Sequence, residues 1–343
     1  MNESSKLENL FVEITNKCAL KCRHCSSEAS PSGQEHISIN QLVALIDQAY
    51  QMGLKSFTIS GGEPFLHPDI KELLKYLKKK DISTCIYTSG VIQEGNDLIP
   101  FPDRLVDFLR NGLVHNLIFS IQGADSLTHD NITGISGSQI ITLESIAKVK
   151  KNLLPFEIHF VPMKLNYLEI PQVINLAEQL GANQVSLLRL VPQGRCLDSK
   201  EYLLLDRKTA EEFESYVKEL TAQPQGISIR LGTPFNCVTE SEKVCSASLN
   251  KLLISASGEV FPCEAFKFLK GLRNNIHNTE LRMIWKNDIL LNHLRNISLK
   301  DIKVCGDCPS IESCRGGCPG QRMLYNGDIA EGPEPYCKYI LAT

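Results

Sequence analysis

The sequence predicts an α/β fold in which parallel strands alternate with helices, followed by a cysteine-rich segment. Between residues 10 and 223, short apolar runs alternate six times with amphipathic helical patterns. After residue 236 this alternation fades, and eight of the thirteen cysteines lie there. Strands joined by helical crossovers run parallel. Six such units are too few for a closed eight-stranded barrel, so we expect a partial (β/α)6 TIM-type barrel; a doubly wound open sheet is the alternative.

The expected elements follow from the spacing of apolar residues and from the turn residues at their ends. We expect strands at residues 10–15, 55–60, 82–89, 116–122, 156–162 and 184–192. We expect helices at residues 38–53, 67–80, 102–112, 138–151, 168–181 and 207–223. Farther along, residues 251–263 have the pattern of a hairpin with Ser257 and Gly258 in its turn.

These patterns divide the chain into three parts. Residues 1–200 form the expected barrel core, and residues 201–235 form a linker helix and strand. Residues 236–343 form a second, cysteine-rich domain.

The composition limits the expected partners and compartment. The 343 residues carry a formal net charge of -3, too little to indicate nucleic acid or an acidic membrane as partner. The first residues lack the basic and apolar regions of a signal peptide, and no apolar run approaches the roughly 18 residues of a membrane span. We therefore expect a cytoplasmic protein without a membrane or nucleic-acid partner. Thirteen cysteines in such a chain indicate metal binding or catalysis rather than disulfides.

Three cysteines lie directly after the first expected strand, in the stretch TNKCALKCRHCSSEAS. Cys18, Cys22 and Cys25 are separated by three and then by two residues. A structural zinc site normally has four protein ligands. Three thiolates suit an iron–sulfur cubane whose fourth iron stays open for another ligand. The loops after parallel strands are where such folds place their chemistry.

A second motif ends the second expected strand, in the stretch FTISGGEPF. Gly61 and Gly62 allow a ligand to approach the backbone closely, and Glu63 offers an acceptor for an ammonium group. An ordinary glycine turn before a helix is the alternative reading of this motif taken alone.

Together the two motifs resemble the radical SAM superfamily, over residues 10–192. The resemblance implies that Cys18, Cys22 and Cys25 hold a [4Fe-4S] cluster, with His24 as the aromatic residue before the third cysteine. It also implies that the open iron is chelated by S-adenosylmethionine (SAM). Cleavage of SAM then gives a 5′-deoxyadenosyl radical that abstracts hydrogen from an unactivated carbon.

The same resemblance implies a set of SAM-binding residues. Gly61, Gly62 and Glu63 match the motif that holds the methionine ammonium. Ser120, at the end of the fourth strand, matches a position near the ribose and carboxylate. Arg189, on the sixth strand, is expected either to pair with the SAM carboxylate or to be a buried structural arginine.

The C-terminal cysteines include the run CGDCPSIESCRGGC, for which a zinc ribbon is the alternative when it is taken alone. Beside the first two motifs, this segment resembles the SPASM extension of radical SAM peptide maturases. The resemblance implies two auxiliary [4Fe-4S] clusters, three clusters in all, and these two have no open iron. Auxiliary cluster I would be held by Cys237, Cys245, Cys263 and Cys318. Auxiliary cluster II would be held by Cys305, Cys308, Cys314 and Cys337.

Three residues outside these ligand sets need an interpretation. Cys85 lies in an apolar run and is expected to be a buried core residue. Cys196 follows the sixth strand and is expected on the radical face, where its thiol could donate hydrogen as in radical epimerases; a loop cysteine without a role is the alternative. Glu264 follows Cys263, where sulfatase-type relatives carry a catalytic aspartate, and is a candidate base. A solvated acid beside a cluster is its alternative.

The function predicted by these features is oxidation of a ribosomally made peptide or protein side chain, with the auxiliary clusters as electron acceptor. Flavodoxin or ferredoxin is the expected electron donor, and a separate protein is expected to bind the leader of the peptide. The alternative substrates are a sugar, nucleoside, aminoglycoside or tetrapyrrole, acted on by a radical SAM dehydrogenase or epimerase. A non-enzymatic iron–sulfur carrier or zinc-stabilised binding module would explain the cysteines but not the glycine motif.

Overall fold

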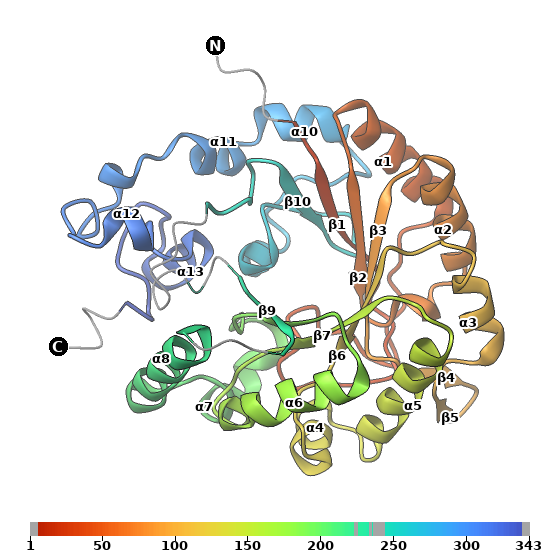
Figure 1. Cartoon of the computed structure of the whole chain (residues 1–343). Helices are drawn as coiled ribbons and strands as arrows, with labels where there is room; N and C mark the ends of the chain where they lie inside the picture. Colours follow the sequence, from red (N-terminus) through yellow and green to blue (C-terminus); the bar gives the residue numbers. More distant parts are fainter. Residues whose placement is uncertain (1–5, 223–225, 233–234, 236–243, 338–343) are drawn as a thin grey trace.

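The computed structural model of the chain describes residues 6–222, 226–232, 235 and 244–337. Within them, nine strands form one curved sheet in the order β11-β10-β1-β2-β3-β6-β7-β8-β9 (Figure 1). The strands that follow one another in sequence and pair in parallel are β1 (Asn9–Thr15), β2 (Ser56–Gly61), β3 (Ser83–Thr88), β6 (Asn116–Ser120), β7 (Phe156–Phe160), β8 (Gln184–Leu187) and β9 (Ser228–Leu231). A doubly wound sheet would reverse its strand order at a switch point. From β1 to β9 the order follows the sequence without reversing, and only β10 and β11 are added on the other side of β1, which confirms the barrel prediction.

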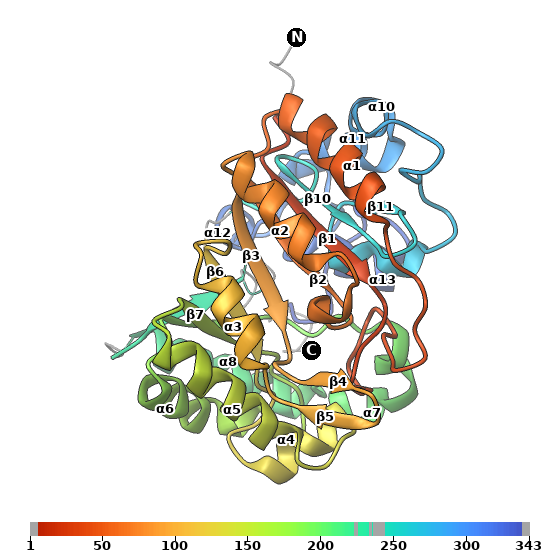
Figure 2. The ribbon, with the colours of Figure 1, turned by 90° about the vertical axis from the view of Figure 1, so that its right-hand side faces the viewer.

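Helices cover the outer face of this sheet, as Figures 1 and 2 show. The crossover helices are α1 (Ile39–Gln51), α2 (Ile70–Lys79), α3 (Asp103–Leu109), α5 (Ser138–Lys151), α6 (Ile170–Leu180) and α8 (Arg207–Ala222). The helix α4 (Ser126–Thr133), the short helix α7 (Lys200–Leu203) and the small hairpin of β4 (Ile92–Glu94) and β5 (Asp97–Ile99) were not expected from the sequence. None of the helices in the described residues has both the length and the hydropathy that a membrane span requires.

The alternation of side chains along β1 separates the core from the inside of the barrel. Leu10, Val12 and Ile14 are buried in the apolar core beneath the helices. Phe11 and Glu13 point the other way and line an internal cavity. Successive side chains of a strand face opposite sides of the sheet. An acid in this otherwise apolar strand is therefore placed inside the barrel.

The C-terminal segment is joined to the barrel by a hairpin. Its first strand, β10 (Lys251–Ile254), pairs in parallel with β1, and β11 (Val260–Phe261) pairs antiparallel with β10. Gly258, with φ +84, lies in the turn, so the hairpin is where the sequence predicts it. The hairpin extends the barrel sheet, however, and the division of the chain at residue 236 stays a prediction.

Short helices follow the hairpin, although the sequence showed little helical periodicity there. They are α10 (Leu281–Asn287), α11 (Ile289–Asn296), α12 (Ile311–Cys314) and α13 (Pro319–Asn326). Trp285 of α10 joins the main apolar core, so this segment also packs on the barrel.

Candidate active site

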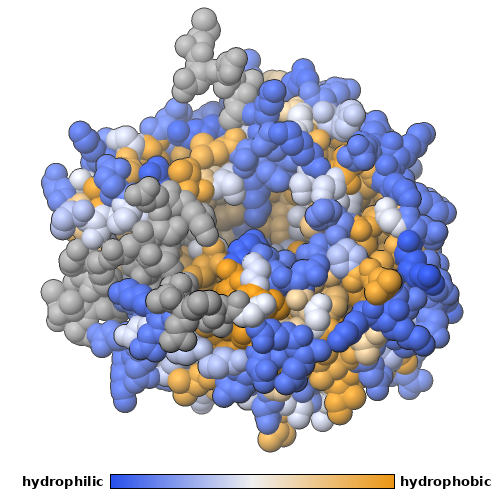
Figure 3. Space-filling view, in the orientation of Figure 1, coloured by the Kyte–Doolittle hydropathy of each residue, from blue (hydrophilic) through white to orange (hydrophobic). Residues whose placement is uncertain are grey.

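A cavity of about 830 Å³ lies inside the curved sheet and reaches the C-terminal segment. Figure 3 shows the molecule hollowed near the middle of the face seen in Figure 1. Predicted site residues from both parts of the chain line this one cavity: Cys18, Cys22, His24, Cys25, Gly61, Gly62, Ser120, Arg189, Cys245, Cys263, Glu264 and Cys318. The structure therefore brings together most of the groups that the sequence singled out.

The first cysteine loop is fixed by backbone contacts with two distant segments. The amides of Lys21 and Arg23 donate to carbonyl groups at the end of α4, at 3.2 and 2.8 Å. The guanidinium of Arg195 donates to the carbonyl oxygens of Cys22, at 3.0 Å, and Ala29, at 2.7 Å. These contacts hold the loop without using a cysteine sulfur.

The three cysteines of this loop line one cavity, where Cys18 is buried and Cys22 and Cys25 are partly buried. Burial raises the pKa of Cys18 and Cys22, the latter to about 12, and the neighbouring thiols raise both further. Three buried thiolates are stable together only when a cation compensates their charge. Among the described residues, no three His, Cys, Asp or Glu side chains are placed to hold a single metal ion. Three thiolates with an open fourth position fit an iron–sulfur cluster better than a structural zinc site, which normally has four protein ligands.

The two glycines let the end of β2 run against the start of the cysteine loop. A Cβ on Gly61, which has φ +127, would lie 2.2 Å from the carbonyl oxygen of Thr15. A Cβ on Gly62 would lie 2.0 Å from the carbonyl oxygen of Lys17. The amides of Gly62 and Glu63 donate to these same oxygens, at 2.7 and 2.8 Å. The motif therefore packs the predicted ammonium site directly against the predicted cluster site.

The carboxylate of Glu63 is fully buried and turned toward β3. It accepts hydrogen bonds from the hydroxyl of Thr88, at 2.9 and 3.0 Å, and from the amide and hydroxyl of Ser89, at 2.9 and 2.7 Å. Thr88 and Ser89 line the cavity, whereas Glu63 is not among the lining residues. Glu63 thus positions two cavity groups, and its direct contact with an ammonium group stays a prediction.

Two histidines line the cavity among or beside the predicted SAM-binding residues. Ser120 lies at the end of β6 with its hydroxyl 3.5 Å from Nδ1 of His159. Burial lowers the pKa of His24 to about 4 and that of His159 to about 3. Both rings are therefore neutral at neutral pH, and they offer the cavity hydrogen bonds and aromatic surface rather than charge.

Arg189 forms a buried ion pair at the cavity wall. Its Nη2 lies 2.6 Å from Oε2 of Glu334, and its guanidinium lies 4.1 Å from the centre of the Tyr336 ring. The two ion-pair side chains are 5% and 1% exposed. A ligand carboxylate would have to compete with Glu334, so the geometry favours the structural interpretation of Arg189 over pairing with SAM.

This ion pair gives a stability prediction. Glu334→Gln should lower the free energy of unfolding by about 3–5 kcal/mol, because it removes the carboxylate from a buried ion pair with the guanidinium of Arg189. The control is Glu94→Gln, which breaks an exposed pair with Arg104 and should cost about 0–1 kcal/mol. Urea unfolding of the anaerobic proteins measures both, and equal losses would contradict the structural role.

The remaining two cysteines differ from their expected environments. Cys196 is fully buried in an apolar cluster that includes Met163 and Leu203, and burial raises its pKa to about 11. It is not among the residues that line the cavity. This position favours the alternative that its thiol has no role as a hydrogen donor.

Cys85 is only partly buried, so the prediction of a buried core residue is wrong. Its neighbours Thr84 and Ile86 take the helix side of β3 instead.

The described C-terminal cysteines fall into two groups by their mutual electrostatic effects, and the assignment of each group to a cluster stays a prediction. Burial raises the pKa of Cys263, Cys245 and Cys318 raise it further, and all three line the cavity. Cys237, the fourth predicted ligand of auxiliary cluster I, lies outside the described residues.

The second set shows the same effects. Burial raises the pKa of Cys305, with additional effects from Cys337 and Cys308. Burial also raises the pKa of Cys314 to about 11, and Cys337 and Cys305 contribute. The twelve cysteines within the described residues are all free thiols, as expected for metal ligands.

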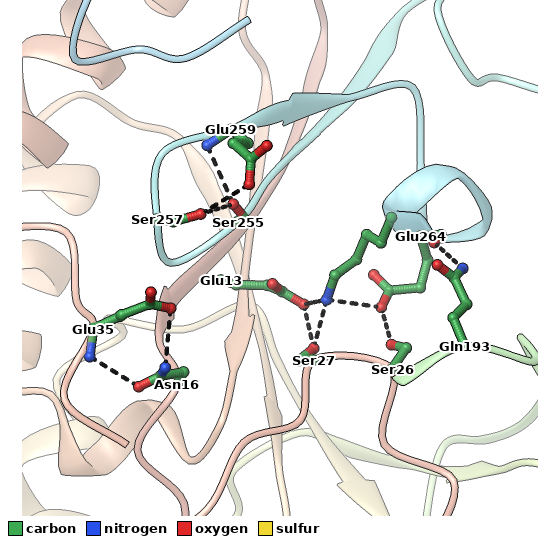
Figure 4. Close-up of polar contacts among 11 residues, drawn as sticks. Glu13, Asn16, Ser26, Ser27, Glu35, Gln193, Ser255, Ser257, Glu259 and Glu264 are labelled. Carbon is green, nitrogen blue, oxygen red and sulfur yellow. Dashed lines mark hydrogen bonds and ion pairs between the residues drawn. The ribbon is translucent and has the colours of Figure 1, made fainter. Parts of the chain in front are cut away.

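Glu264 lies at the cavity wall, and its side chain points toward Ser26 (Figure 4). It accepts a hydrogen bond from the hydroxyl of Ser26, the residue after Cys25. Its backbone carbonyl accepts from the side-chain amide of Gln193 at 2.8 Å. Sequence reasoning found Glu264 but missed Ser26 and Gln193, whose types and spacing carry no signal of their own.

The fold and the site together define a class of enzyme that uses SAM and iron–sulfur clusters for radical chemistry. A model described as the radical SAM superfamily matches residues 12–177, and a model described as an iron–sulfur cluster-binding domain, SPASM, matches residues 245–309. The chain belongs to the radical SAM superfamily and carries a SPASM domain. It is therefore a radical SAM enzyme with [4Fe-4S] clusters and SAM as cofactors, which excludes the non-enzymatic alternatives.

Two relatives span almost the whole chain. The AdoMet-dependent heme synthase of Methanosarcina barkeri is 30% identical. The alignment covers 95% of this chain and 95% of the relative. The PqqA peptide cyclase of Gluconobacter oxydans is 27% identical, over 96% of this chain and 90% of the relative.

Solved structures share the fold at lower identity. Streptococcus suis SuiB bound to S-adenosylmethionine has a TM-score of 0.76 at 19% identity, over 97% of this chain and 78% of SuiB. The enzyme anSMEcpe with bound AdoMet has a TM-score of 0.72 at 19% identity, over 97% and 95% of the two chains.

Proposed function

We propose that this enzyme oxidises an unactivated carbon of a peptide side chain and thereby forms a new bond. The observation that carries the proposal is the single cavity, which is lined by Cys18, Cys22 and Cys25 and by Cys245, Cys263 and Cys318. When bound there, SAM and its cluster supply a 5′-deoxyadenosyl radical that abstracts hydrogen from the substrate. The auxiliary cysteines at the same cavity would hold an acceptor for the electron that remains.

The chain's own residues serve this reaction in two ways. The inward-facing side chains of the barrel separate the substrate from bulk water, which protects a carbon radical from stray hydrogen donors. Glu264 presents a carboxylate at the cavity wall that can accept the proton released when the new bond closes. The atoms and electrons of this oxidation balance. The substrate loses one hydrogen atom to the radical, one proton to the carboxylate and one electron to the acceptor.

Similar proteins support a peptide as substrate. The second relative is named a PqqA peptide cyclase, and SuiB has been solved bound to its precursor peptide SuiA. On this basis we propose a cytoplasmic peptide maturase. A flavodoxin or ferredoxin would reduce the first cluster, and a separate protein would bind the leader.

A second candidate substrate is a carboxylate-bearing tetrapyrrole. The cavity wall carries Arg230, whose side chain is 45% exposed and lies no closer than 3.9 Å to its partner Glu157. It also carries Lys251, whose Nζ lies 5.3 Å from the centre of the Phe11 ring. These cations suit an acidic substrate, and the first relative is named a heme synthase.

The test compares the two substrates in deuterated water without oxygen. Reconstituted enzyme, SAM and dithionite are incubated with a short peptide encoded beside the gene, or with a carboxylate-bearing tetrapyrrole. Loss of two hydrogens from the peptide mass supports the proposal. Gain of one non-exchangeable deuterium would indicate epimerisation, despite the buried position of Cys196. An unchanged peptide with a changed tetrapyrrole would select the second candidate.

A further inference from the structure

A largely buried network of charged and hydroxyl groups joins the loop after Cys25 to the 3-10 helix Glu264–Leu269, which follows Cys263. Figure 4 shows Glu13, Ser26, Ser27 and Glu264 converging from three segments. Glu13 comes from β1, the two serines follow the first cysteine loop, and Glu264 follows the hairpin. Lys267, one turn beyond Glu264, connects them.

Lys267 lies at the centre of this network. Its Nζ is 2.6 Å from Oε1 of Glu13 and 3.4 Å from Oε1 of Glu264, and it donates to the hydroxyl of Ser27 at 2.7 Å. Ser27 in turn donates to Glu13 at 2.5 Å. The side chains of Lys267 and Glu13 are only 9% and 5% exposed. Such contacts are weakly screened by water, so both charges act strongly on their surroundings.

Lys267 carries a permanent positive charge in this position. Burial by itself lowers the pKa of Lys267, but the charges of Glu13 and Glu264 raise it above its ordinary value. The charge of Cys25 acts in the same direction, which places the ammonium within electrostatic reach of the first cysteine loop. The two carboxylates keep the lysine charged, and the lysine in turn holds the two loops together.

We propose that Lys267 is a positioning residue whose fixed positive charge, between the first cluster site and the auxiliary cluster I site, makes both clusters easier to reduce. Net charge near an iron–sulfur cluster is one of the factors that set its reduction potential. A positive charge favours the reduced form, which carries one more electron. The carboxylate of Glu13 acts with the opposite sign. The inference concerns reduction of the clusters and does not depend on the identity of the substrate.

The experiment compares charge variants of the reconstituted holoenzyme. Reduction potentials are measured by redox titration followed by electron paramagnetic resonance, and iron content is measured alongside. Lys267→Met should lower the potentials, and Glu13→Gln should raise them. Lys267→Arg should stay close to wild type. Without any substrate, dithionite-driven formation of 5′-deoxyadenosine by Lys267→Met should fall about tenfold. A tenfold change in a one-electron equilibrium corresponds to a shift of about 59 mV in the reduction potential.

The matched control is Arg273→Met. Arg273 forms an ion pair with Asp288 at 2.8 Å and is also 9% exposed, but this pair does not join the two cysteine loops. It should lose comparable stability with unchanged potentials. The opposite signs expected for Lys267→Met and Glu13→Gln separate an electrostatic role from a structural one. Potentials that stay unchanged, or shift in the same direction in both variants, would overturn the proposal. If Lys267→Met does not fold, Glu13→Gln decides: a raised potential supports the inference, and an unchanged or lowered one overturns it.

Discussion

Replacing Cys22 by alanine should abolish cleavage of SAM while the auxiliary iron stays bound. Cys22 lies in the middle of the first cysteine loop and lines the cavity beside Cys25. Two remaining thiolates cannot hold a cubane that needs three protein ligands and an open iron. Iron should fall from about twelve to about eight atoms per chain, since each cubane holds about four. An iron assay and chromatography of 5′-deoxyadenosine measure both effects.

The control for this variant is Cys85→Ala. Cys85 lies on β3 and belongs to none of the predicted ligand sets. It should keep all the iron and cleave SAM at the wild-type rate. A Cys22→Ala protein that still formed 5′-deoxyadenosine would refute the ligand assignment, because the other sulfurs at the cavity, those of Cys245, Cys263 and Cys318, are assigned to auxiliary cluster I.

The order of strands and helices was predictable because it depends on local patterns. Apolar residues repeat with the period of a helix in α1 and α2, and short apolar runs bounded by turn residues mark β2 and β3. A parallel arrangement then follows from the crossovers. The pairing of β10 with β1 was not predictable in this way. It joins residues about 240 positions apart, and a strand sequence does not specify which sheet edge it will extend.

The candidate site shows the same division between local and distant information. The cysteines and the glycine motif have fixed spacings, so the sequence alone singled them out. Arg189 was ambiguous, because its partner Glu334 is far away in the sequence and only folding brings the two together. Glu13 gave a weak local signal, an acid at an inward position of an apolar strand. Lys267 gave none, since a lysine is ordinarily solvated and nothing in the sequence marks this one as buried.

Packing explains why the two cysteine regions share one cavity. Parallel strands place the loops that follow them on one edge of the sheet, which puts the first cysteine loop beside the glycine motif. The hairpin of β10 and β11 then extends the sheet beyond β1, and Cys263 follows directly after β11. A partial barrel lacks the further strands that close a full barrel. Residues of the C-terminal segment, among them Cys263 and Cys318, line the cavity on that side instead.

Replacing Cys318 by alanine should separate cleavage of SAM from formation of product. Cys318 is buried and lines the cavity with Cys245 and Cys263, so its loss removes one predicted ligand of auxiliary cluster I. The first cysteine loop is untouched, and 5′-deoxyadenosine should still form within about twofold of the wild-type rate when the potential of the first cluster is preserved. Oxidised product should fall at least about 100-fold, because even outer-shell partners of a metal site are worth about 10–100-fold.

The test measures peptide mass and 5′-deoxyadenosine in the same Cys318→Ala reaction. Together the two values show which group accepts the electron from the substrate radical. Continued cleavage with unmodified peptide means that the substrate radical forms but finds no acceptor, as expected if auxiliary cluster I takes the electron. Product at the wild-type rate would show that the electron leaves by another route. Loss of both signals would show that the two cysteine regions depend on each other for assembly. Because Lys267 links these regions through Glu13 and Ser27, the Lys267→Arg variant, which keeps that link, is the reference for assembly.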